Sequence, residues 1–192
     1  MRTTSVQEER ILRASEALFY RFGYQRVTTE QIAKDAGVSK RTIYSLFPSK
    51  LAIVVRSFVR AGRDIDACVA AMDLRSPKAF EQCLKDFLTA VAKGSGRFSA
   101  PLISDLKKCE PRIGARLMKS RTRFLNRHLK SILEKGLEHG LVRQGMQMDA
   151  TVAVTLMALE CLLHPEAREG LRLKAPDPET VVDVLVKGIR PR

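Results

Sequence analysis

The chain has 192 residues and carries 34 Lys or Arg against 21 acids, which gives a formal net charge of +13 and a pI near 10.0. Its 45% of hydrophobic residues suffice for a real core, and its length suits a small domain followed by a larger one. The positive charge favours anionic polymers as partners. No apolar run approaches the roughly 20 residues of a membrane span, and the N-terminus lacks the apolar stretch of a signal peptide, so we expect a cytoplasmic protein.

The residues that usually carry catalysis or bind metals do not form motifs in this sequence. The three histidines show no pairing motif with an acid or a nucleophile, and there is no phosphate-cradling glycine loop. The cysteines lack CxxC or Cys/His ligand spacing, so we expect neither zinc nor a disulfide framework; they are Cys68, Cys83, Cys109 and Cys161. We therefore predict no enzyme activity, no metal and no cofactor. Buried thiols are the favoured interpretation of the cysteines, with redox sensing as the alternative.

The first helix is predicted over residues 5–22. Apolar side chains at positions 11, 14, 18 and 22 follow one face of a helix, and Gly23 is a candidate for the residue that ends it. This helix is expected to support the two that follow.

Residues 28–50, TTEQIAKDAGVSKRTIYSLFPSK, have the spacing of two short crossed helices. Thr28 and Gln31 form a capping box at the start of the first helix. Gly37 supplies the turn, because glycine adopts positive φ without a steric penalty, and Ala33 leaves room where the two backbones approach. Ser39 is the expected N-cap of the second helix. The segment therefore predicts a helix-turn-helix for DNA.

The first turn of the second helix carries the residues that can read bases. Lys40 and Arg41 can donate to guanine O6 and N7, and Thr42 can hydrogen-bond a base or touch a thymine methyl. Other side chains are placed to hold phosphates without reading sequence, and these are Thr28, Thr29, Tyr44 and Lys50. The alternative is a compact helical pair with a solvated basic face.

Residues 23–50, GYQRVTTEQIAKDAGVSKRTIYSLFPSK, resemble the DNA-binding signature of the TetR family of bacterial transcription regulators. The resemblance covers about the first 55 residues closely. It implies a homodimer whose two recognition helices enter successive major grooves of a pseudo-palindromic operator. It also implies a C-terminal domain that binds a small molecule and thereby weakens DNA binding. By position it makes Lys40, Arg41 and Thr42 base readers, and it assigns phosphate contacts to Thr28, Thr29, Ser39, Tyr44 and Lys50.

Two positions depart from the family pattern. Ser45 and Leu46 stand where the family often has a second aromatic residue or His followed by Tyr, so one phosphate contact is expected to be weaker. Arg41 stands where Gly is frequent, so the operator sequence does not carry over from relatives.

The remaining chain is predicted to be helical, which makes the fold all-α: an N-terminal three-helix helix-turn-helix domain (1–50) and a C-terminal helical domain for ligand binding and dimerisation (51–192). After Pro48, a residue type that suits the first turn of a helix, a long helix is expected to begin near Lys50 and to run to about Met72. Ser76-Pro77 opens the next helix, GSGRFS (94–99) is predicted to be a loop, and a short helix around 102–106 is interrupted by Pro111. A long helix is expected over 113–138 and ends at Gly140. Asp149 is expected to cap a helix that stops at Pro165, and Asp177-Pro178 opens the last one.

A basic segment lies at residues 107–130. It contains Lys107, Lys108, Arg112, Arg116, Lys119, Arg121, Arg123, Arg127 and Lys130. A solvated helix face is the favoured interpretation, and an auxiliary surface for flanking DNA or for an anionic ligand is the alternative.

The resemblance also implies an effector pocket and a dimer interface. Apolar or soft residues that could line the pocket are Phe58, Phe87, Met118, Phe124, Met157 and Cys161. The last two helices are expected to pair with their copies in an isologous four-helix bundle through Val152, Leu156, Leu159, Leu163, Val181, Leu185 and Ile189. The alternative is that these stripes pack inside one subunit.

The sequence therefore predicts a sequence-specific DNA-binding transcriptional regulator, with repression and effector-induced release as the family's default. Three alternatives stay open: an activator, an architectural factor without an effector, and a nonspecific nucleic-acid binder whose affinity depends mainly on salt.

Overall fold

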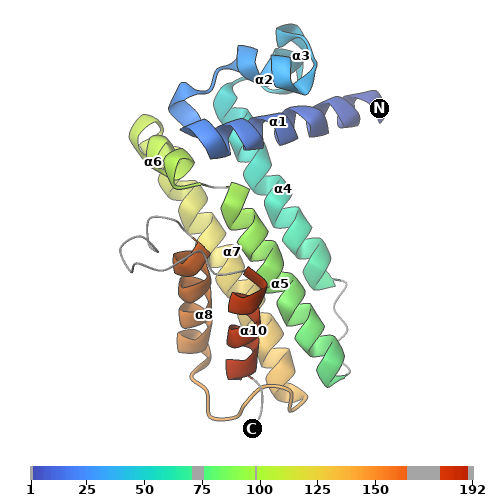
Figure 1. Cartoon of the computed structure of the whole chain (residues 1–192), viewed down its shortest axis with the longest axis vertical. Helices are drawn as coiled ribbons and strands as arrows, with labels where there is room; N and C mark the ends of the chain where they lie inside the picture. The colour runs from blue at the N-terminus through green and yellow to red at the C-terminus, as the bar shows by residue number, and fades with distance from the viewer. Residues whose placement is uncertain (1, 71–75, 98, 164–177, 190–192) are drawn as a thin grey trace. The chain divides into compact units, whose positions relative to one another are not determined.

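The computed structural model describes residues 2–70, 76–97, 99–163 and 178–189, and every element assigned in these ranges is an α-helix (Figure 1). In chain order the helices are α1 (Arg2–Arg26), α2 (Thr29–Ala36), α3 (Lys40–Leu46), α4 (Lys50–Ala70), α5 (Pro77–Arg97), α6 (Ala100–Cys109), α7 (Pro111–Glu138), α8 (Met148–Leu163) and α10 (Pro178–Ile189). The all-α prediction is confirmed. No single helix within the described ranges is both long and apolar enough to cross a bilayer.

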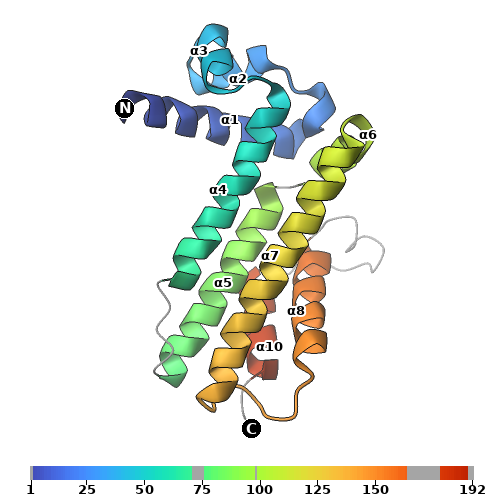
Figure 2. The same ribbon diagram turned by 180° about the vertical axis from the view of Figure 1, so that it is seen from behind.

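The chain divides into two compact units, each discontinuous in sequence. The N-terminal unit comprises residues 1–61 and 96–119, and the C-terminal unit comprises residues 62–95 and 120–192. This division differs from the expected boundary at residue 50, because the first part of α4, up to residue 61, belongs to the N-terminal unit and α6 packs against α1 (Figure 2).

The N-terminal unit is organised around α1, which contacts both α2 and α6. Its fully buried side chains are Ile11, Leu12, Ser15 and Phe19, whereas Phe22 is 42% exposed. Of the predicted stripe, Ala14 and Leu18 are partly buried against the same core as Ile11, and the prediction was wrong for Phe22. The reason is that α6 covers part of α1, and its Leu102 and Leu106 belong to the same core.

Gly23 breaks α1 as predicted, with φ of 78° and ψ of 179°, before a last helical turn reaches Arg26. A Cβ at this position would lie 2.5 Å from Oδ2 of Asp105 on α6. The same carboxylate oxygen accepts from the backbone N–H of Gln25 at 2.9 Å. Glycine therefore permits both the positive φ and the close approach of α6.

Charged side chains hold the first part of α4 against α1. Arg56 donates to Glu8 at 2.6 Å and Arg60 donates to Glu9 at 2.8 Å. Arg60 also pairs with Glu16, and both of these side chains are largely buried. This cluster fixes the direction in which α4 leaves the helix-turn-helix.

The C-terminal unit has its own core, formed by α5, α7, α8, α10 and the second half of α4. The predicted apolar stripe of α5 is confirmed, since Phe80, Leu84, Phe87, Leu88 and Val91 are all buried. Gly140 ends α7 as predicted, with φ of 68° and the N–H of Leu141 bonded to the carbonyl of Gly136 at 2.8 Å.

Several predicted boundaries were wrong. Residues 94–97 continue α5 instead of forming a loop, and Ser99 then caps α6. The predicted start of α4 near Lys50 is confirmed, in contrast, and Ser49 caps this helix, because its hydroxyl accepts from the N–H of Ala52 at 3.1 Å. Asp149 lies in the first turn of α8 without capping it, and its carboxylate binds Lys130 at 2.6 Å. The expected ends at Met72 and Pro165 and the start at Asp177 lie outside the described residues.

Candidate nucleic-acid interface

The helix-turn-helix is formed by α2, Gly37 and α3, with every predicted cap in place. The Thr28 hydroxyl accepts from the N–H of Gln31 at 3.2 Å, and the Gln31 side chain accepts from the N–H of Thr28 at 2.9 Å. Gly37 adopts the left-handed conformation with φ of 61°. The Ser39 hydroxyl accepts from the N–H of Thr42 at 3.0 Å. These bonds set where α3 begins and which residues form its first turn.

The predicted base readers lie in this first turn. Lys40 and Arg41 are exposed, and Thr42 is half-buried. Arg41 has no hydrogen bond or ion pair among the described residues, so its guanidinium is available to a partner outside the chain. The Thr42 hydroxyl lies 2.8 Å from that of Ser39, which ties it to the cap. Lys40, in contrast, is already paired.

The partner of Lys40 is Glu30, a residue that the sequence analysis did not single out. The two side chains form an ion pair between the first turns of α2 and α3. The hydrogen bond from Lys40 is the largest influence on Glu30 and holds the pKa of its carboxyl at about 2, well below the usual 4.5. The pKa of Lys40 is raised by the same pairing. The expected reading surface therefore carries a carboxylate beside its lysine.

Two of the predicted phosphate contacts touch each other. The Tyr44 hydroxyl lies 3.2 Å from the Thr29 hydroxyl, and Tyr44 is 48% exposed whereas Thr29 is buried. Tyr44 is therefore open to a partner outside the chain. Thr29 sits behind it and supports its position.

Lys50 points inward instead of outward. Its ammonium donates to the carbonyls of Tyr24 and Val27, at 2.7 and 2.8 Å, and lies 4.3 Å from the centre of the Tyr24 ring. Burial lowers the pKa of Lys50. In this arrangement two of the three ammonium donors fasten the end of α1 to the start of α4, which does not favour the expected phosphate contact.

Comparison with known proteins identifies the segment. Residues 11–56 match the family model described as bacterial regulatory proteins, tetR family. This segment of the chain carries the DNA-binding signature of the TetR family. An uncharacterised helix-turn-helix transcriptional regulator of Bacillus subtilis (strain 168), YdeS, is 28% identical in an alignment 153 residues long, which covers 74% of this chain and 70% of that protein.

Solved structures of other TetR-type regulators share the fold over nearly the whole chain. A TetR-family regulator from Agrobacterium tumefaciens superposes with a TM-score of 0.71 at 16% identity, covering 97% of this chain and 99% of that one. A transcriptional regulator from Aquifex aeolicus VF5 gives a TM-score of 0.69 at 20% identity, covering 95% and 96%. These likenesses show the fold, and the family-model match over residues 11–56 supports a DNA-binding transcriptional regulator of the TetR type.

The residues expected to line the effector pocket are scattered. Phe58 and Met118 are half-buried in the N-terminal unit, and Phe87 is fully buried in the core of the C-terminal unit. Met157 is 70% exposed and Cys161 is also exposed, so neither lines an interior cavity of one subunit. The expectation was wrong for these two, because the sequence does not reveal which face of α8 meets the core.

Phe124 remains as a candidate, together with two residues that the sequence analysis had not connected. Its ring packs 4.3 Å from the ring of His128, and Nε2 of His128 lies 3.1 Å from Oδ1 of Asp66 on α4. The sequence shows no pairing motif for this histidine, because the acid that it meets in the C-terminal unit lies 62 positions away in the chain. Side-chain accessibility is low at His128 and high at Asp66.

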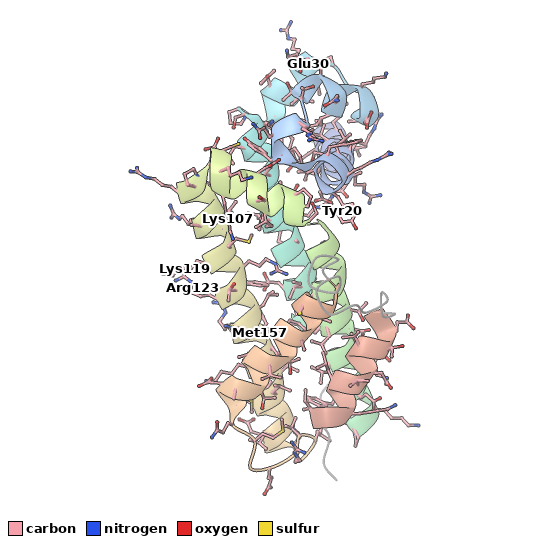
Figure 3. The ribbon with its side chains drawn as sticks, turned by 60° about the vertical axis from the view of Figure 1, so that its left-hand side comes forward. Tyr20, Glu30, Lys107, Lys119, Arg123 and Met157 are labelled. Atoms are coloured by element: carbon pink, nitrogen blue, oxygen red, sulfur yellow. The ribbon has the colours of Figure 1, made fainter. Side chains whose placement is uncertain are left out.

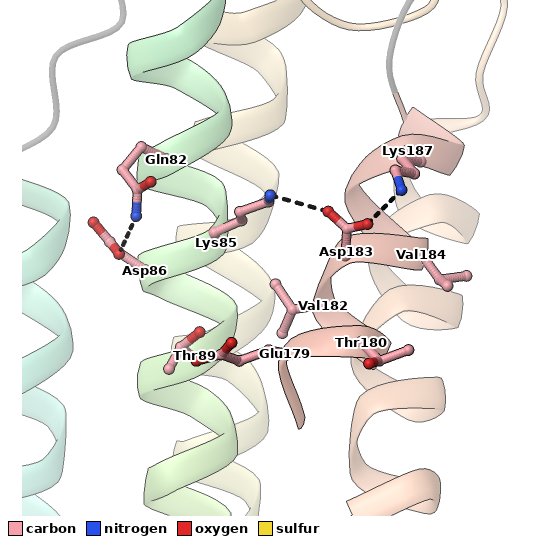
Figure 4. Close-up of a pocket in the computed structure, with 10 residues that line it drawn as sticks. All are labelled: Gln82, Lys85, Asp86, Thr89, Glu179, Thr180, Val182, Asp183, Val184 and Lys187. Carbon is pink, nitrogen blue, oxygen red and sulfur yellow. Dashed lines mark hydrogen bonds and ion pairs between the residues drawn. The ribbon is translucent and has the colours of Figure 1, made fainter. Parts of the chain in front are cut away.

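A groove in the C-terminal unit lies between α5 and α10 and has a volume of about 690 Å³ (Figure 4). Lys85 crosses it to reach Asp183 at 3.0 Å, and Lys187 binds the same carboxylate at 2.5 Å. The groove is polar and charged, and none of the expected pocket residues lines it.

The stripes expected at the dimer interface are mostly inside the C-terminal unit. Val152, Leu156, Leu159, Val181 and Ile189 are buried in its core, Leu185 is partly buried, and the Leu163 side chain lies outside the described residues. This part of the expectation was wrong, because α8 and α10 present these faces to α5 and α7. Their outward faces instead carry Val154, Met157 and Val184, each at least 64% exposed. Figure 3 labels Met157 on α8.

The cysteines also differ from the favoured interpretation. Cys109 and Cys161 are exposed and Cys83 is half-buried, and none of these three forms a disulfide. The Cys68 side chain lies outside the description.

Proposed function

We propose that the chain is a homodimeric, sequence-specific repressor that leaves a pseudo-palindromic operator when a small molecule binds its C-terminal unit. The observation that carries the proposal is the first turn of α3, which is capped by Ser39 and presents an exposed Arg41 with no partner among the described residues. Such a turn suits entry into a major groove, where Arg recognises guanine.

Selection of binding sites from random duplex DNA by the intact protein tests this proposal. We expect a pseudo-palindrome with two half-sites about one helical turn apart. Arg41→Ala should relax the preference at one base pair in each half-site, by about 1–3 kcal/mol of discrimination. Tyr44→Phe should weaken all duplexes without changing the preference, because only a backbone contact is removed. Enrichment of no sequence would favour the nonspecific binder, for which the net charge of +13 is the supporting observation.

The outward faces of α8 and α10 support a dimer. Ala150, Ala153, Val154, Met157 and Cys161 are exposed at helical spacing on α8, and Val184 is exposed on the neighbouring α10. An apolar face of this kind marks an interaction surface, and a two-fold dimer uses the same face of both subunits.

Met157→Lys should convert the dimer into a monomer in sedimentation analysis, because it places a charge at the centre of this face. Val6→Lys on α1 is the matched control, since Val6 is also exposed, at 59%. A dimer that survives Met157→Lys and Val154→Lys together would place the interface elsewhere.

Effector binding is proposed at the cluster of Phe124, His128 and Asp66, where an aromatic ring and two polar groups lie together. Compounds that release the protein from its selected duplex should lose this effect in Asp66→Asn, while DNA affinity without the compound stays unchanged. A reporter gene placed downstream of the selected site separates repression from activation by the direction of the change.

A further inference from the structure

We propose that Glu30 and Lys40 act as one unit that reads a G·C base pair in each half-site of the operator. The inference rests on the proposed sequence-specific function and names one determinant of that specificity. In this proposal Glu30 determines specificity, a role that the sequence pattern did not assign to it.

The placement of the pair supports this role. Glu30 lies in the first turn of α2 and Lys40 in the first turn of α3, so the ion pair bridges the two helices at the start of the recognition helix. Both side chains are more than half exposed, at 58% and 52%. Figure 3 shows Glu30 at the outer end of the helix-turn-helix. The charged atoms are therefore open to a ligand, although each already has a partner.

The order of donors and acceptors matches one base pair better than the other. In the major groove a G·C pair presents two adjacent acceptors, guanine N7 and O6, and then the N4 amino donor of cytosine. An ammonium donates to the two acceptors and a neighbouring carboxylate accepts from the amino group. An A·T pair alternates acceptor, donor and acceptor, so the ammonium cannot bridge two adjacent acceptors there.

The pair also limits binding to other sequences. A lone Lys40 would be attracted to any phosphate, whereas Glu30 occupies its ammonium and repels phosphates when no suitable base pair is present. An exposed ion pair contributes little to the stability of the fold, so stability alone does not explain why this pair is present.

The test is site selection from random duplex DNA by the full-length protein and its Glu30→Gln variant, followed by affinity measurements on the wild-type site and on the same site with each G·C pair replaced. Asp35→Asn is the matched control. It removes one negative charge from an exposed residue of the same helix, but Asp35 has no ion pair with α3 among the described residues.

We expect the wild type to discriminate about tenfold or more at one G·C pair in each half-site. Glu30→Gln should lose most of that preference or change it towards A·T, because an amide pairs with adenine. Both Glu30→Gln and Asp35→Asn should bind random duplex more tightly through the lost negative charge. Only Glu30→Gln should alter the selected sequence.

A double-mutant cycle with Lys40→Met completes the test. If the two residues read one base pair together, the losses from Glu30→Gln and Lys40→Met on the wild-type site are not additive. Additive losses, or a Glu30→Gln variant that selects the wild-type sequence unchanged, would overturn the inference and leave the proposed function intact. A wild type that selects no sequence would overturn both. Glu30→Ala, checked by its melting temperature, replaces Glu30→Gln if the amide variant fails to fold.

Discussion

The ammonium of Lys50 shows how much one side chain can contribute when it satisfies backbone groups. It donates to one carbonyl in the last turn of α1 and to one just after this helix, 2.7 and 2.8 Å away, and lies against the ring of Tyr24. Hydrogen bonds from a charged donor are stronger than neutral ones, and an unsatisfied buried carbonyl is unfavourable. Lys50 therefore helps to position the helix-turn-helix from behind.

Lys50→Met should lower the free energy of unfolding by about 1–3 kcal/mol, because the two carbonyls lose their donor. DNA affinity should fall on all sequences, but the dependence of log K on log salt should keep its slope. Urea unfolding and binding titrations at several salt concentrations measure both effects. Lys34→Met, at an exposed position of α2, is the control. A slope that becomes shallower by about one unit would instead show that Lys50 contacts a phosphate.

Glu30 gives a second prediction for a single residue. Its pKa of about 2 means that the carboxylate remains ionised at every physiological pH. The folded-state pKa is lowered, so the stabilisation is present above the unfolded pKa near 4.3 and is lost as the pH falls through about 2. An NMR titration of the Glu30 carboxyl should give a midpoint near 2, and Lys40→Met should move it back towards 4.5. An unchanged midpoint in that variant would mean that Lys40 is not the cause.

At the scale of helices, Gly136 controls how closely α7 approaches α5. A Cβ at this position would overlap the ring of Phe80 and lie 2.8 Å from a methyl of Val142. Both neighbours are buried in the core of the C-terminal unit, so they have little room to move.

Gly136→Ala should therefore destabilise the protein by about 1–3 kcal/mol through overpacking, although alanine is the better helix former. Gly188→Ala on α10 is the matched control. Nothing lies within 4 Å of the Cβ it would add, so it should be neutral or stabilising by up to about 1 kcal/mol. Denaturant unfolding of both variants distinguishes packing from helix propensity. Equal stabilisation of both would contradict the tight approach.

How much of these elements could be predicted depends on the sequence separation of the contacts. Caps at Thr28, Ser39 and Gly37 involve residues within about four positions, so the sequence contains the whole interaction. The Glu30–Lys40 pair depends on how two helices cross, and the His128–Asp66 contact joins residues far apart in the chain. Phe22 was wrongly assigned to the buried face of α1 for the same reason, because the helix that covers α1, α6, lies about eighty residues further along the chain.

At the scale of the whole molecule, part of the net charge of +13 lies in a row of basic side chains on α7. Arg112, Arg116, Lys119, Arg123 and Arg127 are exposed at helical spacing along α7, and none has an acidic partner among the described residues. Like charges at this spacing repel, at a small cost to the helix. We expect this face to attract polyanions in general, an electrostatic attraction that is strongest at low salt.

The triple variant Arg112→Gln, Arg116→Gln and Lys119→Gln should weaken DNA binding at low salt and change the salt slope by less than one unit. A matched triple variant of exposed residues in the C-terminal unit, Lys78→Gln, Lys135→Gln and Arg143→Gln, should have a similar effect. If the slope of log K against log salt became shallower by two or three units in the α7 variant alone, this face would contact phosphates directly.

The discontinuous N-terminal unit has a consequence for building hybrid regulators. Residues 1–61 share one compact unit with residues 96–119, and α1 buries its Phe19 beside Ser99, whose hydroxyl donates to the Phe19 carbonyl at 3.4 Å. A graft that transfers only the first 50 or 60 residues onto another effector domain would leave α1 without its native neighbour α6. Transplanting the operator preference of this chain therefore requires both segments, or a recipient whose own sixth helix accommodates Gly23 and the face of α1 that α6 covers.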